Sequence, residues 1–78
     1  MTLQEKFNKA RDNFSKNFST ISSFITTELN NGIKTEIKFK DTIVSVGFAN
    51  YSSEDNINDI YLKSMLTAIE NYNLSLVP

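Results

Sequence analysis

The chain contains no cysteine and no histidine. Without cysteine it has neither a disulfide framework nor a thiolate metal site to support its fold. Without histidine it lacks the commonest general base, metal ligand and physiological pH switch. Its only two glycines, Gly32 and Gly47, are too far apart to form a phosphate-binding loop. The sequence therefore predicts no catalytic residue, no cofactor and no metal site, and a fold that depends on apolar packing.

A strong net charge and a long hydrophobic run are also missing. The 78 residues carry a formal net charge of −1, which by itself does not indicate a nucleic-acid partner. No run approaches the ~20 apolar residues of a membrane span, and residues 1–16 are charged and amphipathic, unlike a signal peptide. We expect one domain over residues 1–78, in the cytoplasm and without a membrane partner. Abundant Asn, Lys and Ile with few Gly and Pro is typical of AT-rich coding DNA, which indicates a low-GC bacterium or its phage.

The first third of the chain has helical periodicity. Large apolar residues recur at spacings of three and four from Leu3 to Leu29, in an eleven-residue repeat of about 3.67 residues per turn. We predict one long helix over this range, with Thr2 and Glu5 as a capping pair and Gly32 as a left-handed residue after its end. Because Ser and Thr dominate residues 19–27, a break near Ser19 is the alternative.

From Ile33 the apolar period changes to two, which indicates a β-hairpin. A two-residue loop at Lys40-Asp41 would pair Ile37 with Val44 and put every apolar residue on one face. A four-residue loop with the same register is the alternative. The face turned toward the core would carry Ile33, Thr35, Ile37, Phe39, Thr42, Val44, Val46 and Phe48.

A second helix is expected from about Glu54 to Tyr72, with a Ser cap and acidic residues in its first turn. Its apolar residues cover about half of the circumference, which is typical of a helix that buries two sides. Residues 74–78 would add a short third strand or pack as a tail. The predicted class is α+β: a long N-terminal helix, an antiparallel β-hairpin and a second helix, with the third strand as an option.

The length of the first helix favours a homodimer. At 1.5 Å per residue the range 3–29 would span about 40 Å, whereas a domain of this size is about 30 Å across. Either the helix breaks, giving a monomer, or a second chain covers its overhang.

No constellation in the sequence favours catalysis. Residues 54–59 have the acidic character of a calcium loop but lack its central Gly and closing Glu. Lys63 and Ser64 are adjacent, and neighbours on a helix point in different directions. We therefore expect the protein not to be an enzyme.

Two sets of residues are candidates for contacting a partner. The first is basic and would lie on the hairpin: Lys34, Lys38 and Lys40. The alternative is that these lysines protect an edge strand from aggregation. The second is aromatic: Phe24, Tyr51, Tyr61 and Tyr72. Tyrosine is favoured at interfaces, and the alternative is the ordinary edge of a core.

These observations predict a non-enzymatic protein–protein interaction module, of the kind found among small phage or mobile-element regulators and inhibitors that bind a larger protein. The alternative function is nucleic-acid binding through the lysines of the hairpin and the first helix.

Overall fold

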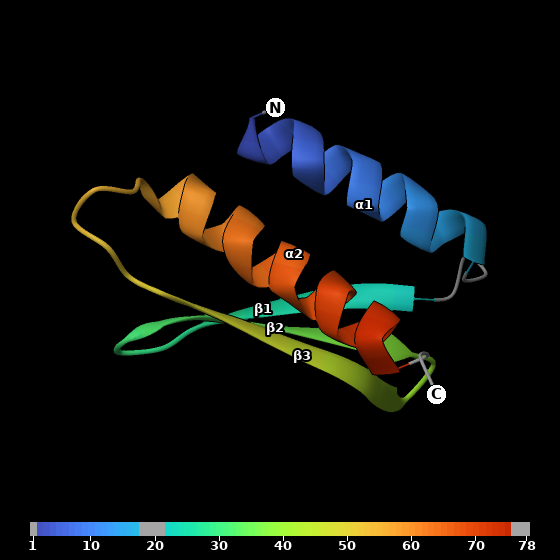
Figure 1. The fold of residues 1–78 in the computed structure, drawn as a ribbon. Helices are drawn as coiled ribbons and strands as arrows, with labels where there is room; N and C mark the ends of the chain where they lie inside the picture. Colours follow the sequence, from blue (N-terminus) through green and yellow to red (C-terminus); the bar gives the residue numbers. More distant parts are fainter. Residues whose placement is uncertain (1, 18–21, 76–78) are drawn as a thin grey trace.

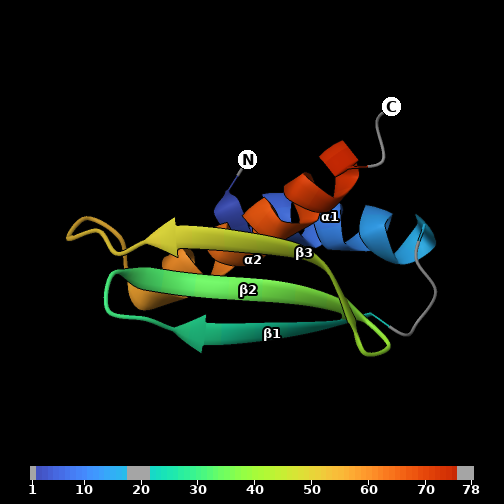
Figure 2. The ribbon, with the colours of Figure 1, turned by 90° about the horizontal axis from the view of Figure 1, so that it is seen from below.

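The computed structural model describes residues 2–17 and 22–75. In chain order it contains α1 (Leu3–Asn17), β1 (Ser22–Glu28), β2 (Gly32–Phe39), β3 (Thr42–Asn50) and α2 (Ile57–Ser75). The strands form one antiparallel sheet in the order β1-β2-β3. Both helices lie on one side of this sheet (Figure 1), and none of the described elements covers its other side (Figure 2). The predicted α+β class, with a helix before and a helix after the hairpin, is confirmed.

The first helix begins as the sequence predicts. The Glu5 backbone N–H donates to Thr2 Oγ1 at 3.1 Å, and the Thr2 hydroxyl donates to Glu5 Oε1 at 3.1 Å. The buried side chains of Phe7 and Phe14, about two turns apart on α1, face α2. The Phe14 ring lies 5.8 Å from that of Phe24 on β1. Thus α1 packs on α2 and reaches the sheet through aromatic side chains.

The prediction of a continuous helix to Leu29 is wrong, because residues 22–28 form β1. Ser, Thr and Ile favour strands over helices, and here β2 supplies a partner for every residue of β1. The break expected near Ser19 agrees with the end of α1 at Asn17, while Phe18 and Ile21 lie outside the described residues. The third strand therefore precedes the hairpin, Leu74 belongs to α2, and residues 76–78 are outside the described range.

A shorter α1 also removes the length argument for a dimer. Fifteen residues span about 22 Å, which fits within the longest extent of 35 Å. The expectation that Gly32 adopts a left-handed conformation after this helix is wrong as well. Gly32 starts β2, and neither glycine has a positive φ.

The hairpin has the predicted two-residue loop, with Phe39 paired to Thr42 around Lys40 and Asp41. Beyond that point the predicted register of the hairpin is wrong. A β-bulge follows the Lys38–Ile43 pair, so Ile37 pairs with Ser45 rather than with Val44. Bulges of this kind insert one extra residue and reverse the facing of the residues beyond them. From Ser45 onward the small residues of β3 therefore face the helices, and Val46 and Phe48 face outward.

The reversal follows from how closely α2 lies on the sheet. A Cβ atom added to Gly47 would lie 2.3 Å from the backbone N of Ala68 and 2.4 Å from the carbonyl O of Ser64. Only a glycine fits at this crossing. The Ser45 hydroxyl, two residues away, donates to the Ala68 carbonyl at 2.7 Å. The inward face of β3 is thus filled by the backbone of α2 rather than by large side chains.

The second helix starts three residues later than predicted, at Ile57, because Asn56 is its cap. The Asp59 backbone N–H donates to Asn56 Oδ1 at 2.9 Å, whereas Ser52 accepts from the Glu54 N–H in the loop before it. As expected, α2 buries two sides. One side packs on β2 and β3, and the other is covered by α1 of the same chain.

The polar core of the helix–sheet contact contains two hydroxyl groups that are fully buried. Thr35 Oγ1 lies 2.8 Å from Ser64 Oγ. The Ser64 hydroxyl donates to the Tyr61 carbonyl at 2.9 Å. Since a hydroxyl has one proton, Thr35 is the donor to Ser64. The β2 hydroxyl consequently depends on Ser64 for its only hydrogen bond in the described part of the chain.

The variant Gly47→Ala is expected to destabilise the fold by about 3 kcal/mol or more, because its methyl group would overlap two backbone atoms of α2 that cannot move independently. Urea unfolding followed by circular dichroism measures this change. Asn50→Ala on the exposed end of the same strand is the control, with an expected change within about 0.5 kcal/mol. Equal stabilities for the two variants would contradict the close contact.

Removing the Ser64 hydroxyl and removing the Thr35 hydroxyl should lower the free energy of unfolding by different amounts. Ser64→Ala leaves the Thr35 hydroxyl buried without a partner and should cost about 1–3 kcal/mol. Thr35→Val leaves Ser64 bonded to Tyr61 and should cost less. Adding Thr35→Val to Ser64→Ala should therefore recover stability, measured by chemical unfolding of all three variants. A double variant less stable than Ser64→Ala would show that the assigned donor is wrong.

Candidate functional site

The helices leave the outer face of the sheet uncovered (Figure 2). Its residues form three rows across the strands, because directly paired residues share a face. These rows are Thr27–Lys34–Phe48, Ile25–Glu36–Val46 and Ser23–Lys38–Ile43. We call these nine residues the open face.

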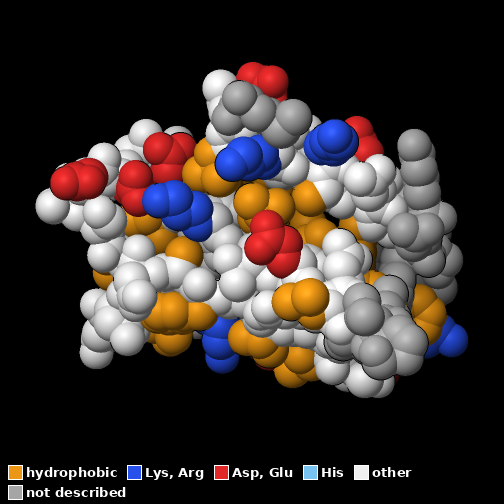
Figure 3. Space-filling model, in the orientation of Figure 1, with side chains coloured by type: hydrophobic (Ala, Val, Ile, Leu, Met, Phe, Trp, Pro, Cys, Tyr) orange, Lys and Arg blue, Asp and Glu red, His pale blue; other side chains and the backbone are white. Residues whose placement is uncertain are grey.

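The open face combines a charged centre with apolar flanks. The central strand contributes Lys34, Glu36 and Lys38, and a 3.8 Å ion pair joins the first two. The flanking apolar side chains are exposed: Ile25 (40%), Ile43 (48%), Val46 (43%) and Phe48 (37%). Along the lower rim of Figure 3, where the sheet lies in Figure 1, a basic side chain lies between hydrophobic side chains. A surface of this composition suits contact with another protein more than permanent exposure to water.

The backbone of β2 holds one of these apolar side chains in place. A Cβ atom added to Gly32 would lie 2.6 Å from Cζ of Phe48 and 2.2 Å from the carbonyl O of Ala49. The Phe48 ring therefore lies directly over Gly32. The reason for a glycine here is the close approach of this ring and of β3, not a left-handed turn.

The structure separates the basic residues proposed from the sequence. Lys34 and Lys38 lie on the open face, whereas Lys40 lies in the tight turn with a φ of 55°. The lysines of α1, such as Lys6 and Lys9, lie on the opposite side of the sheet. Because β2 is the central strand, Lys34 and Lys38 do not protect an edge.

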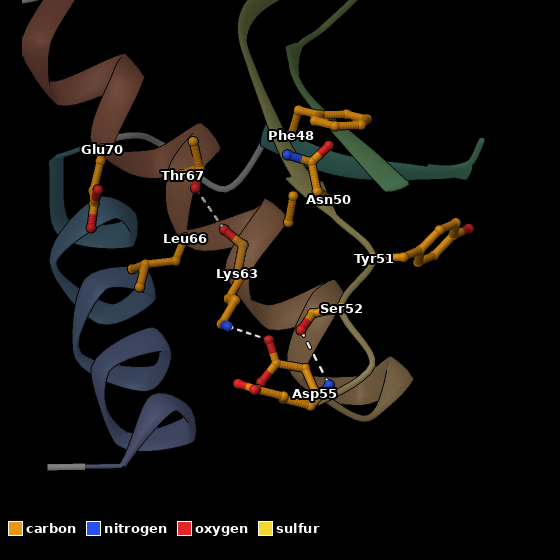
Figure 4. A pocket seen from close by; sticks show the side chains of 11 residues that line it. Phe48, Asn50, Tyr51, Ser52, Asp55, Lys63, Leu66, Thr67 and Glu70 are labelled. Atoms are coloured by element: carbon orange, nitrogen blue, oxygen red, sulfur yellow. Dashed lines mark hydrogen bonds and ion pairs between the residues drawn. The ribbon is translucent and has the colours of Figure 1, made fainter. Parts of the chain in front are cut away.

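The proposed aromatic residues do not form one surface either. Phe24 and Tyr72 belong to the core around Phe14, where the Phe14 and Tyr72 rings meet edge to face at 5.4 Å. Tyr61 on α2 donates a hydrogen bond to Glu28 at the end of β1. Tyr51 is exposed and points away from α2 (Figure 4).

Sequence reasoning missed the apolar members of the open face on β3. Val46 and Phe48 were expected to face the core, and they face outward. The signal that could have identified them is the alternation of Ser45, Gly47 and Ala49, three small residues at a spacing of two. Such a row matches the close approach of a helix backbone, which leaves the larger residues for the other face.

A hollow lies between α2 and the loop that follows β3 (Figure 4). This open cleft of about 670 Å³ is lined by residues from 48–55 and by Lys63, Leu66, Thr67 and Glu70. Lys63 Nζ is paired with Asp55 Oδ2 at 2.5 Å, and Ser64 is buried against Thr35. The adjacent Lys63 and Ser64 therefore point to different partners and do not form a base–nucleophile pair.

The described residues hold no grouping of three or more carboxylates that could bind a metal ion. None of the helices in the described ranges is long and apolar enough to cross a membrane. No protein-family model, curated protein or solved structure matches the chain.

The pKa of Tyr61 is shifted by a neighbouring carboxylate. The hydrogen bond from the Tyr61 hydroxyl to the Glu28 carboxylate, at 2.5 Å, raises the pKa of Tyr61 above its usual value of 10. The bond favours the neutral phenol, and the negative charge of Glu28 opposes formation of the phenolate. Folding therefore gains from this contact below pH 10, and the gain is lost as the pH rises through the pKa of the folded state.

Glu28→Gln is expected to lower the pKa of Tyr61 toward 10, because the neutral amide no longer opposes the phenolate. Absorbance titration at the phenolate band, compared with a Tyr61→Phe variant that removes this phenol, measures the change. Glu54→Gln, an exposed carboxylate in the loop before α2, is the control and should leave Tyr61 unchanged. An identical titration of the Glu28→Gln variant and the native chain would contradict the assigned cause.

Proposed function

We propose that this protein is a non-enzymatic binding module that recognises another protein through the open face of its sheet. The observation that carries the proposal is the outward orientation of Ile25, Ile43, Val46 and Phe48 around the charged residues of β2. Burying these side chains against a partner would contribute about 25 cal/mol per Å² of apolar area removed from water.

The charges at the centre of the open face support a specific partner. Lys34 and Glu36 are paired with each other, so a partner need not neutralise either of them. Lys38 projects from the same strand without a carboxylate within ion-pair distance among the described residues. Charges arranged in this way select a partner and its orientation more than they add affinity.

The same arrangement argues against nucleic acid as the partner. A strand-binding surface needs a continuous basic track with aromatic side chains available for stacking. On the open face Glu36 lies between the two lysines, and the one aromatic ring lies over Gly32.

A surface that binds without a neighbouring catalytic group acts by covering or bridging part of its partner. We therefore place this module among small regulators or inhibitors of a larger protein. Their action depends on occupying a site, which a rigid sheet face can do without changing shape.

Val46→Lys should abolish capture of the partner while leaving the fold intact. The new lysine would lie directly across from Glu36, where opposite charges are favourable, but it would place a charge inside the apolar flank. The measurement is a pull-down from a lysate of a low-GC bacterium, run with and without nuclease treatment and comparing the native chain, Val46→Lys and Leu74→Lys. Leu74, which is 68% exposed on the last turns of α2, is the matched control.

A protein band that is retained by Leu74→Lys and lost with Val46→Lys would support the proposal. Equal capture by all three chains would place the binding surface elsewhere. Capture that disappears on nuclease treatment, falls steeply with salt and is lost in Lys34→Ala with Lys38→Ala would replace the proposal with nucleic-acid binding.

A further inference from the structure

The two edges of the sheet differ in how they are protected. On β3, a bulge interrupts the pairing near Val44, and the side chain of Asn71 on α2 donates to the carbonyl O of Val46 at 2.8 Å. Bulges and occupied backbone groups hinder the addition of another strand. On β1, all seven residues pair regularly with β2, and the strand contains no lysine, proline or bulge. The outer edge of β1 is thus the one suited to strand addition.

A groove on the helix side runs beside this edge. It has a volume of about 360 Å³ and is lined by Thr26 of β1, by Leu62, Met65, Tyr61 and Asn58 of α2, and by Gln4 of α1. Leu62 and Met65 are only half-buried, although both pack against the core. A strand added to β1 would extend the sheet, and its side chains would point alternately to the two faces of the sheet. Every second side chain of the added strand would therefore lie over this groove.

The sequence of β1 is suited to pair with itself. In an antiparallel pair of identical strands related by a two-fold axis, the numbers of any two opposite residues add up to the same sum. This sum must be even, so that the side chains of opposite residues lie on the same face of the sheet. With a sum of 50, every residue from Ser22 to Glu28 is paired with a residue of the other copy. Any other even sum leaves at least two residues of the strand unpaired. At this register Ile25 meets its own copy and Phe24 meets Thr26. Glu28, the one charged residue of β1, meets Ser22, so no like charges are opposed.

We propose that two copies of this chain associate through β1, with the two-fold axis at Ile25. Their three-stranded sheets then join into one continuous sheet. Phe24 of each copy lies beside Thr26 of the other, at the groove that Leu62 and Met65 line. Phe24 is half-buried against Phe14 in one chain, and the second copy covers its remaining surface.

This association goes beyond the proposed binding function and does not depend on it. It uses the backbone of the β1 edge, whereas partner binding uses the side chains of the open face, and Ile25 belongs to both. In the dimer the two open faces become continuous, with the two Ile25 side chains at their centre.

The test uses opposite charges at the two-fold axis. Ile25→Lys and Ile25→Glu would each oppose two like charges with Cβ atoms about 5 Å apart, so each homodimer should dissociate with a dissociation constant at least tenfold higher than that of the native chain. An equimolar mixture of the two variants should restore dimers. Sedimentation equilibrium measures the masses, and circular dichroism checks folding. Ile43→Lys, at a similarly exposed position on β3, is the control that should dimerise like the native chain.

A thiol cross-link gives a second, independent readout, since the chain has no cysteine of its own. In Ile25→Cys the two thiols would face each other across the axis at a separation suited to a disulfide, so the oxidised dimer should form rapidly. In Thr27→Cys each thiol lies opposite Ser23 of the other copy, about 13 Å from its counterpart, and should remain reduced. A chain that stays monomeric up to millimolar concentration, a dimer unaffected by Ile25→Lys, or equal cross-linking of the two cysteine variants would each overturn the proposal.

Discussion

The close crossing of α2 over β3 is the contact on which the rest of the structure depends. At Gly47 the helix backbone lies so near the strand that not even a methyl group fits. On either side the helix is joined to the sheet by hydrogen bonds, from Ser45 to Ala68 and from Thr35 to Ser64. Small residues and internal hydrogen bonds thus replace the large apolar side chains that usually fill a helix–sheet contact.

That crossing also decides the character of the outer surface. Because the small residues of β3 face α2, its larger residues, such as Val46 and Phe48, must face away from the core. The bulge beside Val44 makes the change of face while keeping the tight turn at Lys40. The open face is therefore a direct consequence of how α2 is accommodated, and the same residues that pack the helix create the candidate binding surface.

The formation of β1 at one edge of the sheet depends on pairing with β2. Residues 22–28 have a helical apolar period together with a composition that favours strands, and the period alone predicted the wrong structure. Pairing with β2 stabilises the strand because every residue of β1 finds a partner there. Phe24 then meets Phe14 of α1, so two segments that were predicted to form one helix pack against each other as a helix and a strand. Local periodicity could not show this, because it contains no information about a partner elsewhere in the chain.

By itself, the sequence determined the features that depend on neighbouring residues. These are the cap at Thr2, the position of the turn after Phe39, the two-residue period of the hairpin and the two buried sides of α2. Only the tertiary structure decided the strand at 22–28, the register of β3 and hence the residues of the open face. An alternating strand specifies two faces but not which of them packs inward. That choice was made by the space between Gly47 and the backbone of α2, two segments about twenty residues apart in the chain.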